Sequence, residues 1–331
     1  MAVALIPSWR ETTASEYLER AIDIYYLDPW FALWRSLEAS LIASCELKPP
    51  VLDIGCGDGL FSYLLWSQEH ADFDDYKFYR SRFPPDSFRY SKKVDAGIDL
   101  NEHSVQQAGR IKSYTTLAVA DACSLPYQDD TFNTAFSNCV MEHIPDLDAA
   151  LREVARVLKS EGVFLITVPS ERFGDFLFLS GLFRKLGLKG LADRHERWVN
   201  GKLRHFHTMS HHDWRTHLEG AGFHLVDHCY YVSRRMERCW SIAWMLLGLG
   251  WGRWTLSALT RQVIYLLDAS PSRLHKRLLK ALWTTALSKY VAEDHPAPYG
   301  QGGALFLIAQ RKAVSTVPHR PLPQQTNESR P

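Results

Sequence analysis

Short apolar runs that end in an acidic or polar residue recur along the first half of the chain. The clearest run, Val51–Ile54, is followed by the turn Gly55-Cys56-Gly57-Asp58-Gly59. Apolar residues then return at helical spacing from Leu60 onward. This pattern predicts a buried strand, a tight turn and a helix. Glycine accepts positive φ and has no Cβ, so a bulky ligand can lie against the turn.

Four further strands are predicted in the first half of the chain. They are Val94–Leu100, Leu117–Asp121, Phe132–Asn138 and Gly162–Pro169. Asn101 is placed to cap a helix after the second strand, and Asp146 to cap a helix before the fifth. Strands and helices that alternate at this spacing predict an α/β fold with right-handed crossovers and a parallel sheet.

Helical periodicity also covers residues 13–44, where Pro29 separates two apolar faces. These helices either cap a ligand cleft or pack on a sheet edge, because apolar periodicity reports burial alone. Beyond the fifth strand, Ser210 is placed to cap a helix. Two more strands are predicted at Phe223–Val232 and Gly303–Gln310.

Three long segments interrupt the alternation. Residues 68–93 are rich in phenylalanine and tyrosine and form either an ordered surface loop or a lid or docking surface. Residues 170–208 follow the fifth strand and therefore belong at the carboxyl ends of the strands, where α/β sheets bind ligands. Residues 234–300 are helical in pattern and rich in tryptophan.

The last of these segments has three interpretations. Its apolar run at 241–251 is too short to span a bilayer. A buried helical pair or an oligomer interface would explain it. Because arginines flank the run, an in-plane membrane contact through residues 234–290 is the third interpretation.

Composition narrows the class of protein. The 331 residues are 46% hydrophobic and 23% charged with a net charge of +1, so the chain lacks the broad basic surface of a nucleic-acid-binding protein. The six cysteines show no CxxC pair or zinc-ligand spacing, which predicts reduced thiols in a cytoplasmic protein. The N-terminus lacks the pattern of a signal peptide. His205 and His207 lack an evident third ligand, so no metal site is predicted.

The glycine turn and the acid-ended strands together resemble the class I S-adenosylmethionine-dependent methyltransferases. The branch of this family with the most similar sequence motifs includes ubiquinone and menaquinone biosynthesis enzymes. The resemblance covers residues 50–169 strongly and reappears at 210–233 and 303–312. It implies a Rossmann-like seven-stranded sheet, mostly parallel with the last strand antiparallel, with a helical N-terminal cap and helical insertions.

The expected organisation follows from this resemblance. In chain order it comprises a helical cap at 1–46, a cofactor-binding core at 47–233, a tryptophan-rich helical insertion at 234–300, the last core strand at 301–313 and a disordered tail at 314–331. The core itself carries the insertions at 68–93 and 170–208.

The resemblance also implies which residues bind S-adenosylmethionine. Asp99 would accept the ribose hydroxyls, and Asp121 the adenine amino group. Asp53 would orient the turn or hold the amino group of the methionine moiety through water, and Asn138 would lie beside that moiety. The full expected set is Asp53, Gly55, Cys56, Gly57, Gly59, Asp99, Leu100, Asp121, Ala122, Cys123 and Asn138.

His143, just beyond the fourth strand, is the first candidate for a catalytic base. An imidazole there could take a proton from a hydroxyl near neutral pH. Many members of the family need no such base, so His143 would then only help to close the cleft. His205 and His207 are the next candidates.

The predicted activity is therefore O- or C-methylation of a small-molecule or lipid-like acceptor. The main alternative is an oxidoreductase that uses a nicotinamide cofactor. That class expects the spacing G-x-G-x-x-G, whereas the third glycine here comes one residue early. A second alternative is a non-catalytic S-adenosylmethionine-binding protein, which the intact strand-terminal acids disfavour. The acceptor and the oligomeric state cannot be read from the sequence.

Overall fold

The computed structural model describes most of the chain. The described residues are 11–25, 28–67, 90–248, 250–251, 254–255, 274–293 and 302–313. Most of the aromatic insertion expected at 68–93, a large part of the segment at 234–300 and the tail at 314–331 lie outside the described residues. The expectations for those parts therefore stay predictions.

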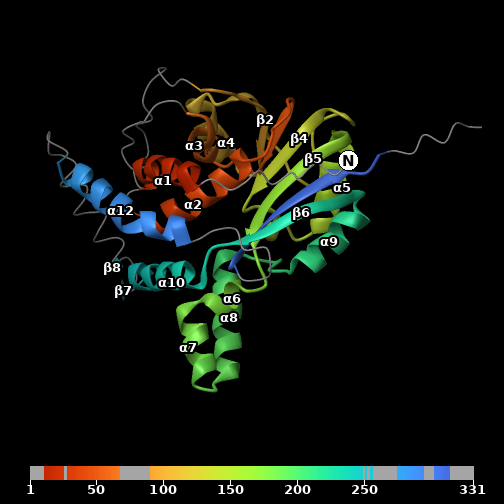
Figure 1. The fold of residues 1–331 in the computed structure, drawn as a ribbon. Coiled ribbons are helices and arrows are strands. Elements are labelled where there is room, and N and C mark those ends of the chain that lie inside the picture. Colours follow the sequence, from red (N-terminus) through yellow and green to blue (C-terminus); the bar gives the residue numbers. More distant parts are fainter. Residues whose placement is uncertain are drawn as a thin grey trace, which may run out of the picture.

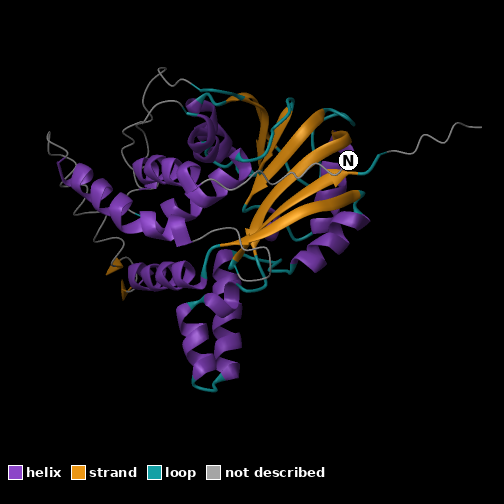
Figure 2. Cartoon of the chain, viewed as in Figure 1, coloured by secondary structure: helices purple, strands orange, loops and turns teal. Residues whose placement is uncertain are grey.

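A seven-stranded sheet forms the centre of the described chain (Figures 1 and 2). Its strands are β1 (Val51–Ile54), β2 (Val94–Asp99), β3 (Tyr114–Val119), β4 (Phe132–Asn138), β5 (Leu158–Pro169), β6 (Phe223–Tyr231) and β9 (Ala304–Arg311). The order across the sheet is β3-β2-β1-β4-β5-β9-β6, and β9 is antiparallel to both of its neighbours. The predicted mostly parallel sheet with an antiparallel last strand is confirmed.

The strand bounds differ from the predictions by more than one residue at two strands, β3 and β5. β3 begins at Tyr114 and ends at Val119, because Tyr114 pairs with Val94 at the start of β2. Asp121 therefore lies in the turn beyond the strand rather than at its last position. β5 begins at Leu158, four residues early, because Leu158 pairs with Phe132 before a register shift in β4.

Helices cover both faces of the sheet (Figure 1). One core contains buried residues of α1 (Glu11–Tyr25), α2 (Pro29–Ala43), α3 (Leu60–Trp66) and α4 (Glu102–Ile111). The other core contains buried residues of α5 (Leu147–Val157) and α9 (His211–Gly220). Since both faces are covered, the parallel strands read as apolar runs in the sequence.

The predicted helix caps are confirmed by their hydrogen bonds. Asn101 accepts from the backbone N–H of Ser104 at 3.1 Å, and Asp146 accepts from Ala149 at 3.0 Å. Ser210 forms a capping box with Asp213 at the start of α9. These local hydrogen bonds fix the residue at which each helix begins.

The remaining elements lie outside the seven-stranded sheet. They are a short 3₁₀ turn at Met141–His143, α6 (Phe173–Phe176), α7 (Phe178–Lys185), α8 (Lys189–Leu203), α10 (Arg234–Gly248), α12 (Leu274–Glu293) and the strand pair β7 (Gly250–Trp251) and β8 (Trp254–Thr255). In Figure 1, α7 and α8 form a hairpin that projects from the rest of the described chain. Across the described residues, we find no helix with the length and apolarity needed to cross a membrane.

Candidate active site

The glycine turn connects β1 to α3 at the carboxyl edge of the sheet. Gly55, Gly57 and Gly59 all have positive φ, at 77°, 54° and 80°. A Cβ on Gly55 would overlap the side chain of Val140, whereas a Cβ on Gly57 would meet nothing within 4 Å. Gly55 therefore permits close packing, while Gly57 faces open space where a ligand could lie against the backbone.

These two glycines give a matched test of the turn. Gly55→Ala is expected to destabilise the protein by about 1–3 kcal/mol through overpacking against Val140, with backbone strain in addition. Gly57→Ala carries the strain alone, about 1–2 kcal/mol. Urea unfolding of both variants measures the difference. Equal losses of stability in the two variants would show that overlap with Val140 adds nothing to the cost of a Cβ on Gly55.

Most backbone N–H groups of the turn already donate hydrogen bonds within the protein. Gly57 donates to Oδ2 of Asp99 at 2.9 Å, and Leu60 donates to Oδ1 of Asp58 at 3.2 Å. The N–H groups of Gly55 and of the following cysteine both donate to the carbonyl oxygen of Ile98 at 2.8 Å. Carboxylates thus occupy positions where a bound phosphate would accept hydrogen bonds.

The predicted ribose and adenine residues lie in the turns that follow β2 and β3. The second carboxylate oxygen of Asp99 accepts from the N–H of Asn101 at 2.8 Å. Asp121 is exposed and accepts from the N–H of Cys123 at 2.9 Å. Leu100 is 73% exposed, and Ala122 is partly exposed. Because β2 and β3 are adjacent parallel strands, both carboxylates lie along one edge of the sheet.

Asp53 is placed differently from the other acids. Its side chain is 2% exposed, and its Oδ2 accepts from the hydroxyl of Tyr114 at 2.6 Å. Burial raises the pKa of the Asp53 carboxyl to about 7. Buried contacts of this kind favour the role of orienting the turn over direct access to a ligand.

A buried polar network centred on Glu38 was missed by the sequence analysis. Glu38 is 0% exposed and accepts from the Arg35 guanidinium at 2.6 Å, the Asn138 amide at 3.0 Å, the Cys139 thiol at 2.9 Å and the Tyr231 hydroxyl at 3.2 Å. The network joins α2 to the ends of β4 and β6. The available signal was an arginine and a glutamate three residues apart within an otherwise uncharged helix.

His143 lies on the 3₁₀ turn after β4, with 39% of its side chain exposed. Its Nδ1 is 3.0 Å from the carbonyl oxygen of Arg204. A carbonyl only accepts, so Nδ1 carries the proton and Nε2 keeps its lone pair, at 3.7 Å from Oε1 of Glu142. Burial lowers the pKa of His143, which keeps this imidazole neutral at neutral pH.

Two further titratable groups surround His143. Glu142 is 1% exposed, its Oε2 has no hydrogen-bond partner, and burial raises the pKa of its carboxyl to about 8. The ring of His205 lies 5.3 Å from that of His143, and burial lowers the pKa of His205 to about 4. The structure therefore brings His143 and His205 together across 62 positions of sequence.

Glu142, His143 and His205 each offer one potential metal-ligand atom, and these atoms lie within 4.8 Å of one another. The sequence analysis predicted no metal site and considered His205 with His207. His207 makes a different contact, with its Nε2 at 2.9 Å from the carbonyl oxygen of Ile144. The cluster supplies three of the four ligands in a closed zinc site, so it is a candidate cation site.

Residues 48–196 match the model of a family described as a methyltransferase domain. The matched segment contains the glycine turn, Asp99, Asp121, Asn138 and His143. Over this segment the chain is therefore similar to a class I methyltransferase domain. Its strand order and its antiparallel β9 agree with this assignment.

Three curated methyltransferases are similar to parts of the chain. Demethylmenaquinone methyltransferase of Symbiobacterium thermophilum is 26% identical over 44% of this chain. Malonyl-[acyl-carrier protein] O-methyltransferase of Geobacter sulfurreducens is 28% identical over 57%, and sterol 4-C-methyltransferase strm-1 of Caenorhabditis elegans is 29% identical over 40%. The chain covers 53%, 61% and 35% of the lengths of these relatives, respectively.

The match to the methyltransferase domain leaves part of the candidate site unassigned. Arg35 and Glu38 precede the matched segment, and His205 and Tyr231 follow it. These residues surround the ends of the methyltransferase strands but come from the cap and from later elements. They are therefore features of this chain that the domain model does not describe.

Proposed function

We propose that the methyltransferase domain binds S-adenosylmethionine and methylates the oxygen or carbon of a small-molecule or lipid-like acceptor. When bound, S-adenosylmethionine supplies an electrophilic methyl group on a positively charged sulfonium. Four acidic residues lie at this edge of the sheet: Asp53 is buried in β1, Asp58 lies in the glycine turn, Asp99 ends β2, and Glu142 is buried in the 3₁₀ turn after β4. Burial raises the pKa of Asp53, Asp58 and Glu142, so a cationic ligand would stabilise their charged forms.

The bonding of the glycine turn is the observation that carries this proposal. Dinucleotide-binding sites place a pyrophosphate on free N–H groups at the helix N-terminus. Here the N–H groups of Gly57 and Leu60 already donate to carboxylates. A carboxylate at that position attracts a cation and repels a pyrophosphate. The residues present therefore fit S-adenosylmethionine better than a nicotinamide dinucleotide.

Residues of this chain would then contact successive parts of the cofactor along the edge of the sheet. The open face of Gly57 would lie against it, with Gly55, Gly59 and Cys56 shaping the turn. Asp99 and Leu100 would flank the ribose. The backbone of Ala122 and Cys123 would face the adenine ring beside Asp121, and Asn138 would lie at the methionine end.

Asp99 provides a direct test of this arrangement. Asp99→Ala is expected to weaken binding of S-adenosylmethionine by about 1.5–3 kcal/mol, the scale of hydrogen bonds to a charged group. The nearby exposed acid Glu102 is a matched control, because Glu102→Ala removes the same charge one turn away. Calorimetry measures both affinities. Unchanged binding by Asp99→Ala would contradict the assigned role.

His143 is the proposed general base. Its Nε2 keeps its lone pair because Nδ1 carries the proton toward Arg204, and its lowered pKa keeps it able to accept a proton near neutral pH. The side chain is partly exposed on the 3₁₀ turn after β4, and the Arg35 guanidinium of the Glu38 network adds to the effect of burial in lowering its pKa. A hydroxyl or an acidic carbon of the acceptor would be the proton donor.

An aromatic cluster next to this histidine pair favours an apolar acceptor; Phe173 and Trp34 are buried in it, and Trp240 is partly exposed. Phe173 contacts the rings of His205 at 5.3 Å, Trp240 at 5.9 Å and Trp34 at 6.4 Å between centroids. The relatives are named for a quinone precursor, a sterol and a malonyl carrier protein. Large apolar rings beside a polar base suit an acceptor with an apolar body and one reactive polar group.

The acceptor class can be tested with methyl-labelled S-adenosylmethionine and a fractionated extract of the host. We expect label to enter the fraction of organic-extractable, lipid-like compounds, and His143→Ala to abolish most of this transfer. Label that enters only nucleic acid would contradict the proposed acceptor class.

A further inference from the structure

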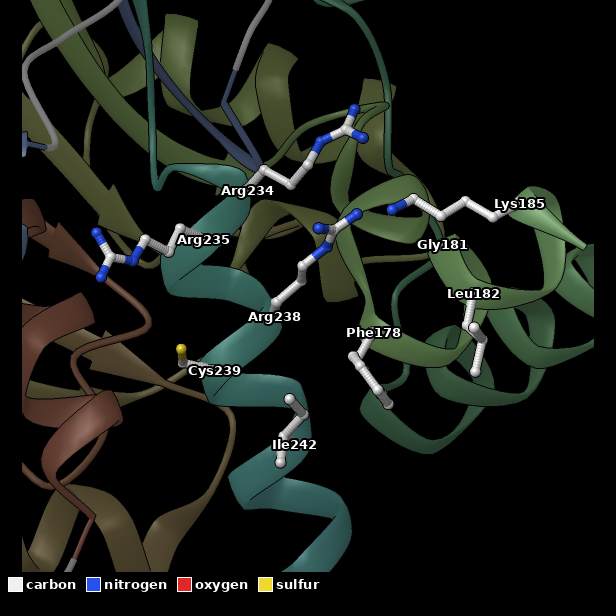
Figure 3. A pocket seen from close by; sticks show the side chains of 9 residues that line it. All are labelled: Phe178, Gly181, Leu182, Lys185, Arg234, Arg235, Arg238, Cys239 and Ile242. Carbon is white, nitrogen blue, oxygen red and sulfur yellow. The ribbon is translucent and has the colours of Figure 1, made fainter.

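A groove of about 490 Å³ lies between α7 and α10, away from the glycine turn (Figure 3). On α7, its lining recurs at helical spacing through Phe178, Gly181, Leu182 and Lys185. The opposite wall on α10 contributes Arg234, Arg235, Arg238, Cys239 and Ile242. Gly181 brings the walls close, because a Cβ at this position would lie 3.3 Å from the Arg238 guanidinium.

The groove is cationic at one end and apolar at the other. In Figure 3 the side chains of Arg238 and Lys185 extend from the two walls toward the same space, with Arg234 above them. The lining contains no acidic residue, and Nε of Arg238 is a buried donor without a hydrogen-bond partner. Phe178 and Leu182 are 37% and 40% exposed. Convergent cations without a counter-ion are complementary to an anion.

Three nearby acids pair with another cation, and a fourth, Glu237 of α10, is fully buried, which raises the pKa of its carboxyl. Asp175, Asp193 and Glu196 all pair with Arg184, on α7 one residue before Lys185. Within the described part of the chain, the side chains of Lys185 and Arg238 form no ion pair with a carboxylate. Among the described residues, the charges of these two side chains are therefore available to an anion.

Exposed apolar side chains continue from the groove to the tip of the projecting hairpin. Leu186 and Leu188, in the connection between α7 and α8, are 62% and 44% exposed, and Leu191 in the first turn of α8 is 47% exposed. Lys185 and Lys189 flank them. An apolar tip bordered by cations is the arrangement by which in-plane elements enter the boundary between lipid headgroups and acyl chains.

We propose that the α7–α8 hairpin and the α7–α10 groove dock on a membrane surface that contains anionic phospholipid. Arg238, Lys185 and Arg234 would hold a lipid phosphate, and an acyl chain would follow Phe178, Leu182 and Ile242. The tip leucines would enter the interfacial layer. This docking goes beyond methyl transfer and does not depend on it.

Charge favours a membrane over a second copy of the chain. A twofold contact places the same patch of both copies face to face, so the cations of the groove would repel one another. A lipid surface supplies both a negative potential and an apolar layer to the same patch. The sequence analysis considered membrane contact through residues 234–290. The arginines of α10 belong to that range, whereas the apolar part of the surface comes from α7 and α8.

Co-sedimentation of the full chain with lipid vesicles tests the proposal. We expect binding to vesicles of phosphatidylcholine mixed with phosphatidylglycerol, and little binding to phosphatidylcholine alone. The double variant Lys185→Gln/Arg238→Gln should bind roughly 25-fold more weakly, at about fivefold for each basic residue near the surface. Salt at about 1 M, where the Debye length is about 3 Å, should release the protein.

Two control variants separate specific docking from general charge. Arg152→Gln/Arg215→Gln also lowers the net charge by two, from +1 to −1, but changes exposed residues of α5 and α9. It should bind like the wild type. Leu186→Ser/Leu188→Ser retains every charge and should lose binding on the order of tenfold, because it removes exposed apolar groups from the tip. Circular dichroism and affinity for S-adenosylmethionine should be unchanged in all three.

Several results would overturn the proposal. The first is binding to neutral vesicles that is as tight as binding to anionic vesicles. The second is a loss of binding in Arg152→Gln/Arg215→Gln as large as that in Lys185→Gln/Arg238→Gln. Binding of soluble glycerol phosphate without vesicle binding would assign the groove to a soluble anion. Dimerisation that is lost in the leucine variant, without vesicle binding, would assign the tip to a second copy.

Discussion

His143→Ala is expected to lower turnover by about 10²–10⁴-fold while cofactor affinity barely changes. The imidazole Nε2 is the proposed proton acceptor, and the contact between Nδ1 and Arg204 fixes its tautomer. Steady-state turnover together with calorimetric affinity separates this role from simple closure of the cleft. A closing residue would weaken cofactor binding and leave the pH profile of the remaining rate unchanged.

His143→Gln sharpens the distinction, since glutamine can hydrogen-bond but cannot accept a proton at these pH values. The wild-type rate should fall as the pH drops through the lowered pKa of His143, because only the neutral imidazole is a base. This pH dependence should disappear in the glutamine variant. Near wild-type turnover of the glutamine variant would rule out the base. Loss of wild-type activity on chelation would instead assign His143 with Glu142 and His205 to a cation site.

Glu38→Ala is expected to destabilise the protein by about 3–5 kcal/mol, the cost of removing one partner of a buried charge pair. The substitution leaves the Arg35 guanidinium without its carboxylate and removes the acceptor of the Asn138 amide, the Cys139 thiol and the Tyr231 hydroxyl. Urea unfolding measures the loss.

An exposed glutamate provides the control for this variant. Glu219→Ala on α9 should change stability by less than about 0.5 kcal/mol, since the side chain is exposed. Glu38→Gln retains one acceptor oxygen and should lie between the two. A Glu38→Ala variant as stable as Glu219→Ala would show that the network does not hold α2 against the sheet.

Local signals made much of the fold predictable. β4 has the predicted bounds, and Asn101, Asp146 and Ser210 cap the expected helices, because apolar runs and caps depend on neighbours within a few residues. The start of β5 was wrong by four residues, since a register shift against β4 is a pairing effect that one strand does not encode.

The candidate site was predictable only for residues that belong to a short sequence motif. Asp99 and the glycine turn lie together as the resemblance implied. Glu38 meets Tyr231 across 193 positions, and His143 meets His205 across 62, so neither contact has a local pattern. The apolar residues of α7 were visible in the sequence. Their exposure was not, because exposure depends on what the rest of the chain covers.

Calorimetric titration of the wild-type chain with S-adenosylmethionine and, separately, with NADH decides between the two cofactor classes. Carboxylates occupy the N–H groups of the glycine turn, so we expect one S-adenosylmethionine to bind per chain and NADH to give no binding heat. Binding of NADH without binding of S-adenosylmethionine or its demethylated product would contradict the proposed methyltransferase function.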